Sequence, residues 1–319
     1  MASRRAIVTG AGGFVGACLA RRLLAEGHPV ELWVRPGSDT WRLDTLAGEA
    51  RVTEVELTDD DAVLSAARRA RAEWVFHLAA HGAYSWQTDL RRIMEVNAIA
   101  TTTVAEAAVA AGCEAFVHAG SSSEYGFKDH PPHEDELPEP NSAYAVGKVA
   151  ATAYCRWLAQ REGALVRTLR LYSVYGPWEA SGRLIPTLVA LGLEGRLPPL
   201  VDPDIARDFV FVEDVCDAFI LAAADRSGDL AGVYNVGTGH QTTLSELVEV
   251  ARAAFEITEQ PEWGTMEARS WDTATWVADP RRIARELGWR PRTSLEDGLR
   301  ATGTWLLDRS ELRARYASA

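Results

Sequence analysis

The chain has 319 residues, 47% of them hydrophobic, which is enough to fill one large α/β domain and a smaller one beside it. Its formal net charge of −12 argues against nucleic acid and against an anionic membrane surface as partners. The cysteines Cys18, Cys113, Cys155 and Cys216 lie far apart in no metal-binding pattern, so we expect reduced thiols, no metal and a cytoplasmic protein. We also expect no secretory leader, and no apolar run approaches the roughly 20 residues that span a bilayer.

The first strand that the sequence predicts, Ala6–Thr9, leads into a glycine-rich turn and then into a helical run from about Val15 to Glu26. Glycines spaced three residues apart permit a tight turn, close approach of a pyrophosphate and close packing of the helix on the strand. Strand, turn and helix in this order predict a dinucleotide-binding site. The residues of this site are Gly10, Gly12, Gly13, Phe14, Val15 and Gly16.

The second predicted strand, Val30–Val34, ends at Arg35. A protein that prefers NAD often places an acid at this point to bind the adenosine ribose, whereas a guanidinium suits the 2′-phosphate of NADP. Arg35 therefore favours NADP(H), and a merely solvated arginine with NAD(H) as the cofactor stays the alternative.

Further strands are predicted near Arg51–Val55, at Trp74–Leu78, at Ala115–His118 and at Val166–Leu171, with helical runs between them. Such alternation predicts an α/β fold with a Rossmann-type, doubly wound parallel sheet, whose ligands bind at the carboxyl ends of the strands. We expect further cofactor contacts at these ends from Glu56, Leu57, Leu78, Ala79 and Ala80.

Tyr144 and Lys148 are four residues apart in a helical run that Ser142 can cap, so they share one helix face. An ammonium beside a phenol favours the phenolate, and free tyrosine, with a pKa of about 10, needs such help to exchange protons near neutrality. A hydroxyl from the run Ser121–Ser123, such as that of Ser121, can share the same substrate oxygen. The set predicts proton transfer to or from a secondary alcohol or a ketone.

These residues and several later segments, taken in order, resemble the extended short-chain dehydrogenase/reductase family, and within it the nucleotide-sugar epimerases, dehydratases and reductases. The matching segments are Thr9–Gly16, His77–Ala80, Ser121–Gly126, Tyr144–Lys148, Leu169–Pro177, Arg207–Val215 and Tyr234–Gly239. The resemblance implies a Rossmann-type NAD(P) domain over residues 1–175, to which 205–240 return. It implies a smaller C-terminal α/β domain, from 176–204 and 241–319, that binds a nucleoside-diphosphate sugar.

By the same resemblance Tyr144 is the acid/base, and Lys148 lowers its pKa and binds the nicotinamide ribose. Ser121 is the hydroxyl partner of Tyr144, with Ser122 as a second candidate because the serines are consecutive. The resemblance places Asn97, Tyr172 and Val174 at the cofactor. We expect His81, which follows the fourth strand, and Ser122, Ser123, Ser173, Arg183, Arg207 and Arg269 at the substrate, with Arg207 by resemblance and Arg269 as a second candidate for the diphosphate.

Two alanine-rich helical runs, Ile93–Ala111 and the one that carries Tyr144 and ends near Arg161, are of the kind that packs against its twin in a homodimer of this family. Ordinary internal packing is the alternative. We expect a homodimer.

The reaction is narrowed by one departure from the family pattern. Dehydratases of this family usually carry an acidic residue two positions after the catalytic hydroxyl, and this chain has Ser123 at that position. The next residue, Glu124, is acidic, but in an extended segment its side chain would point to the opposite side. We therefore expect reduction of a nucleotide-linked 4-keto sugar at C4, with Tyr144 as proton donor; 4-epimerisation with a tightly bound, recycled NAD is the alternative. Dehydration, a small-alcohol oxidoreductase and a non-catalytic sensor or scaffold are less favoured.

Overall fold

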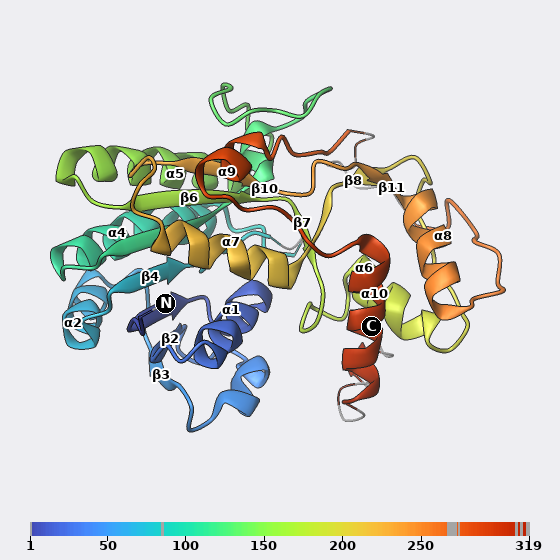
Figure 1. Ribbon diagram of the computed structural model, residues 1–319, viewed down its shortest axis with the longest axis horizontal. Coiled ribbons are helices and arrows are strands. Elements are labelled where there is room, and N and C mark those ends of the chain that lie inside the picture. Colours follow the sequence, from blue (N-terminus) through green and yellow to red (C-terminus); the bar gives the residue numbers. More distant parts are fainter. Residues whose placement is uncertain are drawn as a thin grey trace.

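The computed structural model describes residues 2–83, 86–266, 273, 275–309, 312 and 315–316. Its centre is a seven-stranded sheet in the order β10-β6-β5-β4-β1-β2-β3, in which all neighbouring strands are parallel (Figure 1). This confirms the predicted Rossmann-type α/β fold. The strands are β1 Ala6–Thr9, β2 Val30–Val34, β3 Arg51–Glu54, β4 Trp74–His77, β5 Ala115–Ser121, β6 Val166–Leu171 and β10 Val233–Val236.

Helices cover both faces of this sheet, which is why its inner strands are apolar on both sides. In β5, Val117 belongs to the hydrophobic cluster that includes helices α1 and α7, whereas Phe116 belongs to the cluster on the opposite face, beneath α2, α4 and α5 (Figure 1). The helices are α1 Phe14–Ala25, α2 Asp60–Ala70, α4 Ala100–Ala110, α5 Ala143–Glu162 and α7 Val212–Ala224, with a 3₁₀ helix, η1, at Trp41–Leu46.

The helical run expected at Ile93–Ala111 begins a little earlier and contains an irregular turn. It consists of α3 (Leu90–Met94), the π-helical turn η2 (Glu95–Ile99) and α4. By length and composition alone, Leu90–Ala110 could cross a membrane, which the sequence analysis did not anticipate. Half of this stretch is buried inside the molecule, and the core helix of a globular protein passes the same test.

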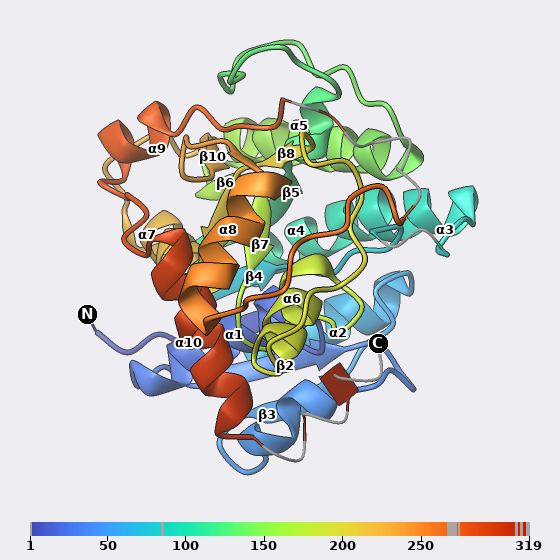
Figure 2. The ribbon, with the colours of Figure 1, turned by 90° about the vertical axis from the view of Figure 1, so that its right-hand side faces the viewer.

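The second half of the chain adds a smaller group of helices beyond the carboxyl ends of the strands (Figure 2). Leu188, Leu247 and Leu299, one from each of three helices, meet in a hydrophobic cluster of their own. These helices are α6 Leu184–Gly192, α8 Leu244–Phe255 and α10 Leu295–Leu307. Two short strand pairs adjoin them, the antiparallel β8 Ala206–Arg207 with β11 Thr242–Thr243 and the parallel β7 Ser173–Tyr175 with β9 Phe209–Phe211.

Part of 241–319 returns to the large sheet instead of staying with the small group. Ile283, from helix α9 (Arg281–Glu286), and Trp289 lie in the same hydrophobic cluster as α7. The indole of Trp289 also donates a hydrogen bond of 2.8 Å to the carbonyl of Asp214 in α7. The two groups of elements are therefore tied together by buried contacts.

Candidate active site

The glycine turn after β1 has the geometry that the sequence predicted. Gly10 has a left-handed φ of +65°, and its carbonyl accepts a 2.9 Å hydrogen bond from the amide of Gly13. Gly13 is the N-cap of α1. Because glycine has no side chain, the backbone amides of the first helical turn receive no hydrogen bond from a capping side chain. A helix N-terminus open in this way fits a pyrophosphate. The turn brings together all six expected residues, Gly10, Gly12, Gly13, Phe14, Val15 and Gly16.

The turn after β2 offers a guanidinium to its surroundings. Arg35 is exposed, and the hydroxyl of Ser38 donates a 2.7 Å bond to its carbonyl. The first acid after β2, Asp39, accepts bonds from the amide of Trp41 at 3.1 Å and from the guanidinium of Arg315 at 2.8 Å. The carboxylate of Asp39 thus has hydrogen-bond partners already. The charged side chain next to the end of β2 is the guanidinium of Arg35.

The segment after β4 is fixed by a side chain on the irregular helical turn. The Oδ1 of Asn97 accepts a 2.8 Å bond from the amide of His81, and its Nδ2 donates a 2.7 Å bond to the carbonyl of His81. The amides of Leu78 and Ala79 donate to the hydroxyl of Thr9 at 3.2 and 3.3 Å. Asn97 therefore steadies the turn that carries Ala79, Ala80 and His81 beside the glycine turn.

Glu56, expected at the adenine, already has partners. Its carboxylate accepts a 3.1 Å bond from the guanidinium of Arg92, and the hydroxyl of Thr58 donates to it at 2.8 Å. Partial burial acts to raise the pKa of Glu56, but the bonds from Thr58 and the charge of Arg92 outweigh it and hold the pKa below its usual value. Any contact of Glu56 and Leu57 with adenine stays a prediction.

The pair Tyr144 and Lys148 lies in the first turns of α5, beside the end of β5. The Nζ of Lys148 is 5.8 Å from the centre of the Tyr144 ring and donates a 2.8 Å bond to the carbonyl of Ala119. The hydroxyl of Ser121 acts to lower the pKa of Tyr144, and its role as the catalytic partner of the phenol stays a prediction. Lys148 is only 1% exposed.

The electrostatics of this pair are set mainly by its burial. Burial raises the pKa of Tyr144 to about 12, the charge of Glu124 raises it further, and the bond to Ser121 and the charge of Arg183 only partly compensate. Burial likewise lowers the pKa of Lys148 to about 8. Desolvation dominates the pKa of both groups, and the expectation that Lys148 lowers the pKa of the phenol stays a prediction.

The three serines form one tight turn in which Ser121 caps the 3₁₀ helix η3 (Ser122–Tyr125). The Oγ atoms of Ser121 and Ser123 are 2.7 Å apart, and the amide of Ser123 donates to the Oγ of Ser121 at 3.2 Å. Ser122 is buried and lines a pocket. The turn therefore assigns Ser121 to Tyr144 and Ser122 to the adjoining pocket, which separates the two candidates.

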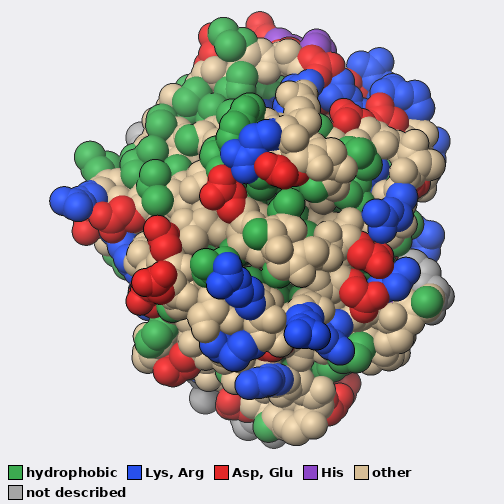
Figure 3. Space-filling model, turned by 90° about the vertical axis from the view of Figure 1, so that its left-hand side faces the viewer, with side chains coloured by type: hydrophobic (Ala, Val, Ile, Leu, Met, Phe, Trp, Pro, Cys, Tyr) green, Lys and Arg blue, Asp and Glu red, His purple; other side chains and the backbone are tan. Residues whose placement is uncertain are grey.

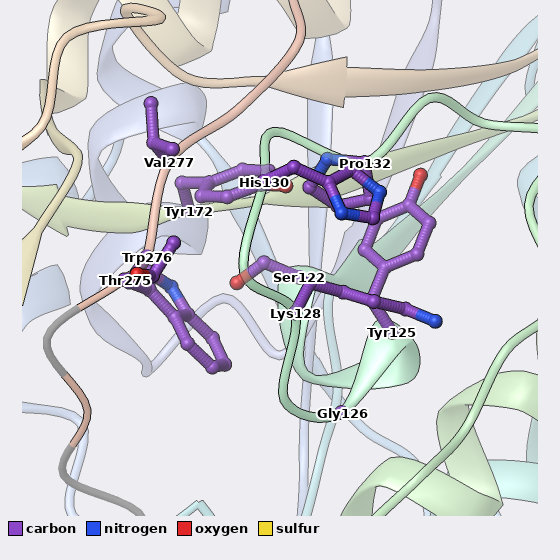
Figure 4. Close-up of a pocket in the computed structure, with 10 residues that line it drawn as sticks. All are labelled: Ser122, Tyr125, Gly126, Lys128, His130, Pro132, Tyr172, Thr275, Trp276 and Val277. Carbon is purple, nitrogen blue, oxygen red and sulfur yellow. The ribbon is translucent and has the colours of Figure 1, made fainter.

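The pocket next to the serine turn lies between the loop after η3 and a segment near the end of the chain (Figure 4). Ser122 and Trp276 lie on opposite sides of it, and the hydroxyl of Tyr172 is buried there without a hydrogen-bond partner in the described part of the chain. The guanidinium of Arg207 lies 5.8 Å from the Trp276 ring. The pocket is lined by Ser122, Tyr125, Gly126, Lys128, His130, Pro132, Tyr172, Thr275, Trp276 and Val277.

The remaining predicted residues are placed as follows. The amide of Ser173 donates a 3.0 Å bond to the carbonyl of Asp208, and Val174 packs against the main core. Arg183 precedes α6, with its Nε 3.9 Å from the carboxylate of Glu179, and its charge reaches Tyr144. Arg269 lies outside the described residues.

The sequence did not predict two sets of buried polar contacts, those of Asp208 and the pairing of Glu124 with Arg170. Asp208 accepts backbone bonds from Thr238, at 2.7 Å, and Ala278, at 3.0 Å, and so ties the segment between β8 and β9 to the segment after β10 and to the one before α9. Arg170 and Glu124 form a buried ion pair behind the serine turn, with an Nε–Oε2 distance of 2.9 Å. The signal was in the sequence, because an arginine inside the apolar strand Val166–Leu171 must find a buried partner.

A Rossmann-type sheet that brings a glycine turn, a hydroxyl and a Tyr/Lys pair to one edge defines a short-chain dehydrogenase/reductase. The chain belongs to the NAD dependent epimerase/dehydratase family, whose model matches residues 6–237. Its relatives in this family are nucleotide-sugar epimerases, dehydratases and reductases, and it is an enzyme of that kind.

Two relatives span nearly the whole chain. A UDP-glucose 4-epimerase from Mycolicibacterium smegmatis is 31% identical, covering 96% of this chain and 100% of its own length. A dTDP-glucose 4,6-dehydratase from Streptomyces griseus is 30% identical, over 94% and 93%. Among solved structures, MoeE5 in complex with UDP-glucose and NAD is similar with a TM-score of 0.81 and 32% identity, over 96% of this chain and 99% of that one.

Proposed function

We propose that this enzyme reduces a nucleoside-diphosphate-4-keto-(deoxy)sugar at C4, using NADP(H). The observation that carries the choice of reaction is Arg35. It is exposed directly after β2, where an NAD-preferring enzyme would present an acid, and Asp39 is held by Arg315. A cofactor that is consumed in each turnover, as NADPH is, suits reduction better than a recycling reaction.

The glycine turn, Arg35 and Lys148 would hold the cofactor, whose nicotinamide supplies hydride when bound. Tyr144 donates the proton to the C4 oxygen, and its raised pKa keeps the phenol protonated at neutral pH, ready to give that proton. Ser121, whose hydroxyl acts on the phenol of Tyr144, shares the same oxygen. Lys148 holds its ammonium below the ring and replaces part of the charge as the phenol loses its proton.

Elimination of water is disfavoured by the serine turn. A dehydratase needs an additional acid and base near the sugar, and the position where its relatives carry an acid is Ser123, whose hydroxyl lies 2.7 Å from that of Ser121. The carboxylate of Glu124 is already bonded to Arg170 and to the backbone amide of Ser121.

The residues around the pocket support a nucleotide-sugar substrate. Trp276 and the adjacent guanidinium of Arg207 offer a flat face and a cation, which suit a base or sugar ring and a diphosphate. Ser122 and Tyr172 offer hydroxyls to the sugar. Arg183 and Arg269 remain further candidates for the diphosphate.

A second candidate, 4-epimerisation with tightly bound NAD, is favoured by a different observation. The relative at 31% identity is a UDP-glucose 4-epimerase, and MoeE5 was solved with NAD. Epimerisation would use the same Tyr144, Ser121 and Lys148, so the site geometry supports both reactions.

The cofactor in the purified enzyme separates the two candidates. The protein is denatured, and the released nucleotide is identified and counted. An empty protein that binds NADPH more tightly than NADH, and then oxidises NADPH when given a 4-keto sugar nucleotide, supports the reductase. Stoichiometric bound NAD and interconversion of UDP-glucose with its C4 epimer would replace it with the epimerase.

We also infer a homodimer through the outer faces of α4 and α5. Figure 3 shows hydrophobic side chains gathered on part of the surface that it displays. Ile99 in η2, and Val146 and Trp157 in α5, are among the large exposed hydrophobic residues. Changing Trp157→Glu should convert a dimer into monomers in sedimentation experiments, whereas a wild type that sediments as a monomer would refute the dimer.

A further inference from the structure

A buried ion pair lies directly behind the serine turn. Glu124 is fully buried and Arg170 is 4% exposed, and the Nε of Arg170 is 2.9 Å from the Oε2 of Glu124. The other oxygen of the same carboxylate, Oε1, accepts a 2.9 Å bond from the backbone amide of Ser121. One carboxylate thus joins the guanidinium to the backbone of Ser121, whose hydroxyl acts on the phenol of Tyr144.

The guanidinium is fixed from other directions as well. Its Nη1 donates to the hydroxyl of Tyr125 at 2.8 Å and to the carbonyl of Glu134 at 3.1 Å. The hydroxyl of Tyr125 in turn donates to the Oδ1 of Asn235 in β10 at 2.8 Å. Arg170 is therefore anchored to a neighbouring strand and to the loop after η3, so it provides a rigid base for Glu124.

The approach of Glu124 to Ser121 also depends on Gly120. A Cβ at that position would lie 2.7 Å from the Oε1 of Glu124. The last residues of β5 are thus shaped to admit this carboxylate beneath the turn. Its charge is balanced by Arg170, which is what a buried carboxylate requires.

We propose that Glu124 and Arg170 are positioning residues that hold the Ser121 hydroxyl against Tyr144 and set the electrostatic surroundings of the phenol. Neither residue touches substrate in this role; both act through Ser121 and Tyr144. The inference rests on the proposed C4 chemistry only in that proton exchange at C4 passes through Tyr144, a step that reduction and epimerisation share.

The charged groups around Tyr144 and Lys148 make the proposed role of Glu124 measurable through the pKa values of these two residues. Tyr144 faces Ser121 and Glu124 from the serine turn, Arg183 from the segment before α6, and Lys148 from its own helix. Glu124 acts to raise the pKa of Tyr144, where burial is the larger cause, and it opposes the lowering of the pKa of Lys148.

The groups around Lys148 and Arg170 complete this electrostatic environment. Lys148 also feels Cys155, and its own charge acts on His77 and His118 on the sheet beneath it. Arg170 faces Glu124 and Tyr125. Neutralising Glu124 should therefore lower the pKa of both Tyr144 and Lys148, because both feel its negative charge.

The test uses Glu124→Gln, which keeps an oxygen acceptor for the Ser121 amide but removes the charge, and Arg170→Lys, which keeps a cation but loses the fork geometry. The matched control is Arg167→Lys. Arg167 is a fully buried arginine of the same strand, but it donates to the carbonyls of Asp229, Ala222 and Asp225.

In both test variants kcat should fall about tenfold or more with KM little changed, as expected when a proton-transfer geometry is loosened. In Glu124→Gln the alkaline limb of the pH–kcat profile should also move to lower pH, by about half a unit or more. Arg167→Lys should lose a similar amount of thermal stability but keep wild-type kcat and the wild-type pH profile. Equal losses of kcat in Arg167→Lys, or unchanged kcat and pH limb in folded Glu124→Gln and Arg170→Lys, would overturn the proposal.

The wild type is assayed with NADPH and a 4-keto sugar nucleotide, and separately with UDP-glucose. Activity only with UDP-glucose rejects the proposed reduction, but the kcat values of the variants can still be compared in that reaction. If the wild type shows neither activity, hydrogen–deuterium exchange at the Ser121 amide tests the positioning role instead. Exchange that is faster in Arg170→Lys but not in Arg167→Lys supports the positioning role, and unchanged exchange refutes it.

Discussion

A Cβ at Gly10 would lie 2.6 Å from the backbone nitrogen of Ala79, so the glycine turn after β1 and the end of β4 touch backbone against backbone. Gly163 provides a matched comparison, because it has a nearly identical φ of +63° but no atom within 4 Å of such a Cβ. Gly163→Ala should cost about 1 kcal/mol for the left-handed backbone alone. Gly10→Ala should cost several-fold more and abolish cofactor binding, as measured by chemical denaturation and NADPH titration. Equal losses in the two variants would contradict the close approach.

Tyr144→Phe removes the proton donor but keeps the ring. We expect kcat to fall at least about a hundredfold, because general acid catalysis contributes roughly that much, while the cofactor dissociation constant stays within about threefold. Tyr154→Phe is the control on the same helix, since its hydroxyl bonds Glu106 away from the site. A near-normal turnover for Tyr144→Phe would remove Tyr144 from the mechanism.

Arg35→Ala should weaken NADPH about tenfold or more and NADH little, because a charge-assisted bond to the 2′-phosphate is lost only with NADPH. The measurement is a fluorescence titration with both cofactors. Arg196→Ala, which removes an exposed arginine paired with Glu194, should change neither affinity. Equal losses of NADPH and NADH would withdraw the main support for reduction over epimerisation.

Lys148→Met tests the burial of the ammonium through the pH dependence of stability. The folded protein releases the Lys148 proton near pH 8, whereas the unfolded chain holds it to about 10.5. Between these values the unfolded state binds more protons, so the free energy of unfolding of the wild type should rise with pH relative to Lys148→Met, with a slope approaching about 1.4 kcal/mol per pH unit. Below pH 8 the difference in free energy of unfolding between the wild type and Lys148→Met should be constant.

Urea unfolding of the wild type and of Lys148→Met, both without cofactor and between about pH 7 and pH 9.5, measures this difference in the free energy of unfolding. A difference that does not change with pH would mean that the folded-state pKa of Lys148 is not lowered. Lys148→Met should in any case lose turnover, because the variant cannot hold a positive charge below Tyr144.

The sequence predicted what depends on short chain distances. The glycine turn, the capping of α5 by Ser142 and the shared face of Tyr144 and Lys148 all follow from spacings of a few residues, and the structure has them. Ser121 could be separated from Ser122 only once the turn was seen, because the cap at Ser121 sends the two hydroxyls to different places.

What the sequence could not provide depends on residues far apart in the chain and on burial. Glu124 meets Arg170 across 46 positions, and although an arginine in an apolar strand indicates a buried partner, no local pattern identifies that partner as Glu124. Burial is the largest cause of the raised pKa of Tyr144, and the spacing of Tyr144 and Lys148 could not predict it, because a neighbouring ammonium can be read from spacing whereas burial cannot. The reaction itself turns on a few pocket residues, among them Trp276, that no short motif marks.

The strand order has a consequence for how the protein is made. β6 pairs with β5 on one side and with β10 on the other, and β10 is Val233–Val236. While the ribosome is still adding α7, β6 therefore remains an open edge of a parallel sheet, with hydrogen-bonding groups available to another nascent chain. Translation that stalls or terminates between residues 171 and 233 should yield fragments prone to aggregation, and synthesis past residue 236 closes that edge.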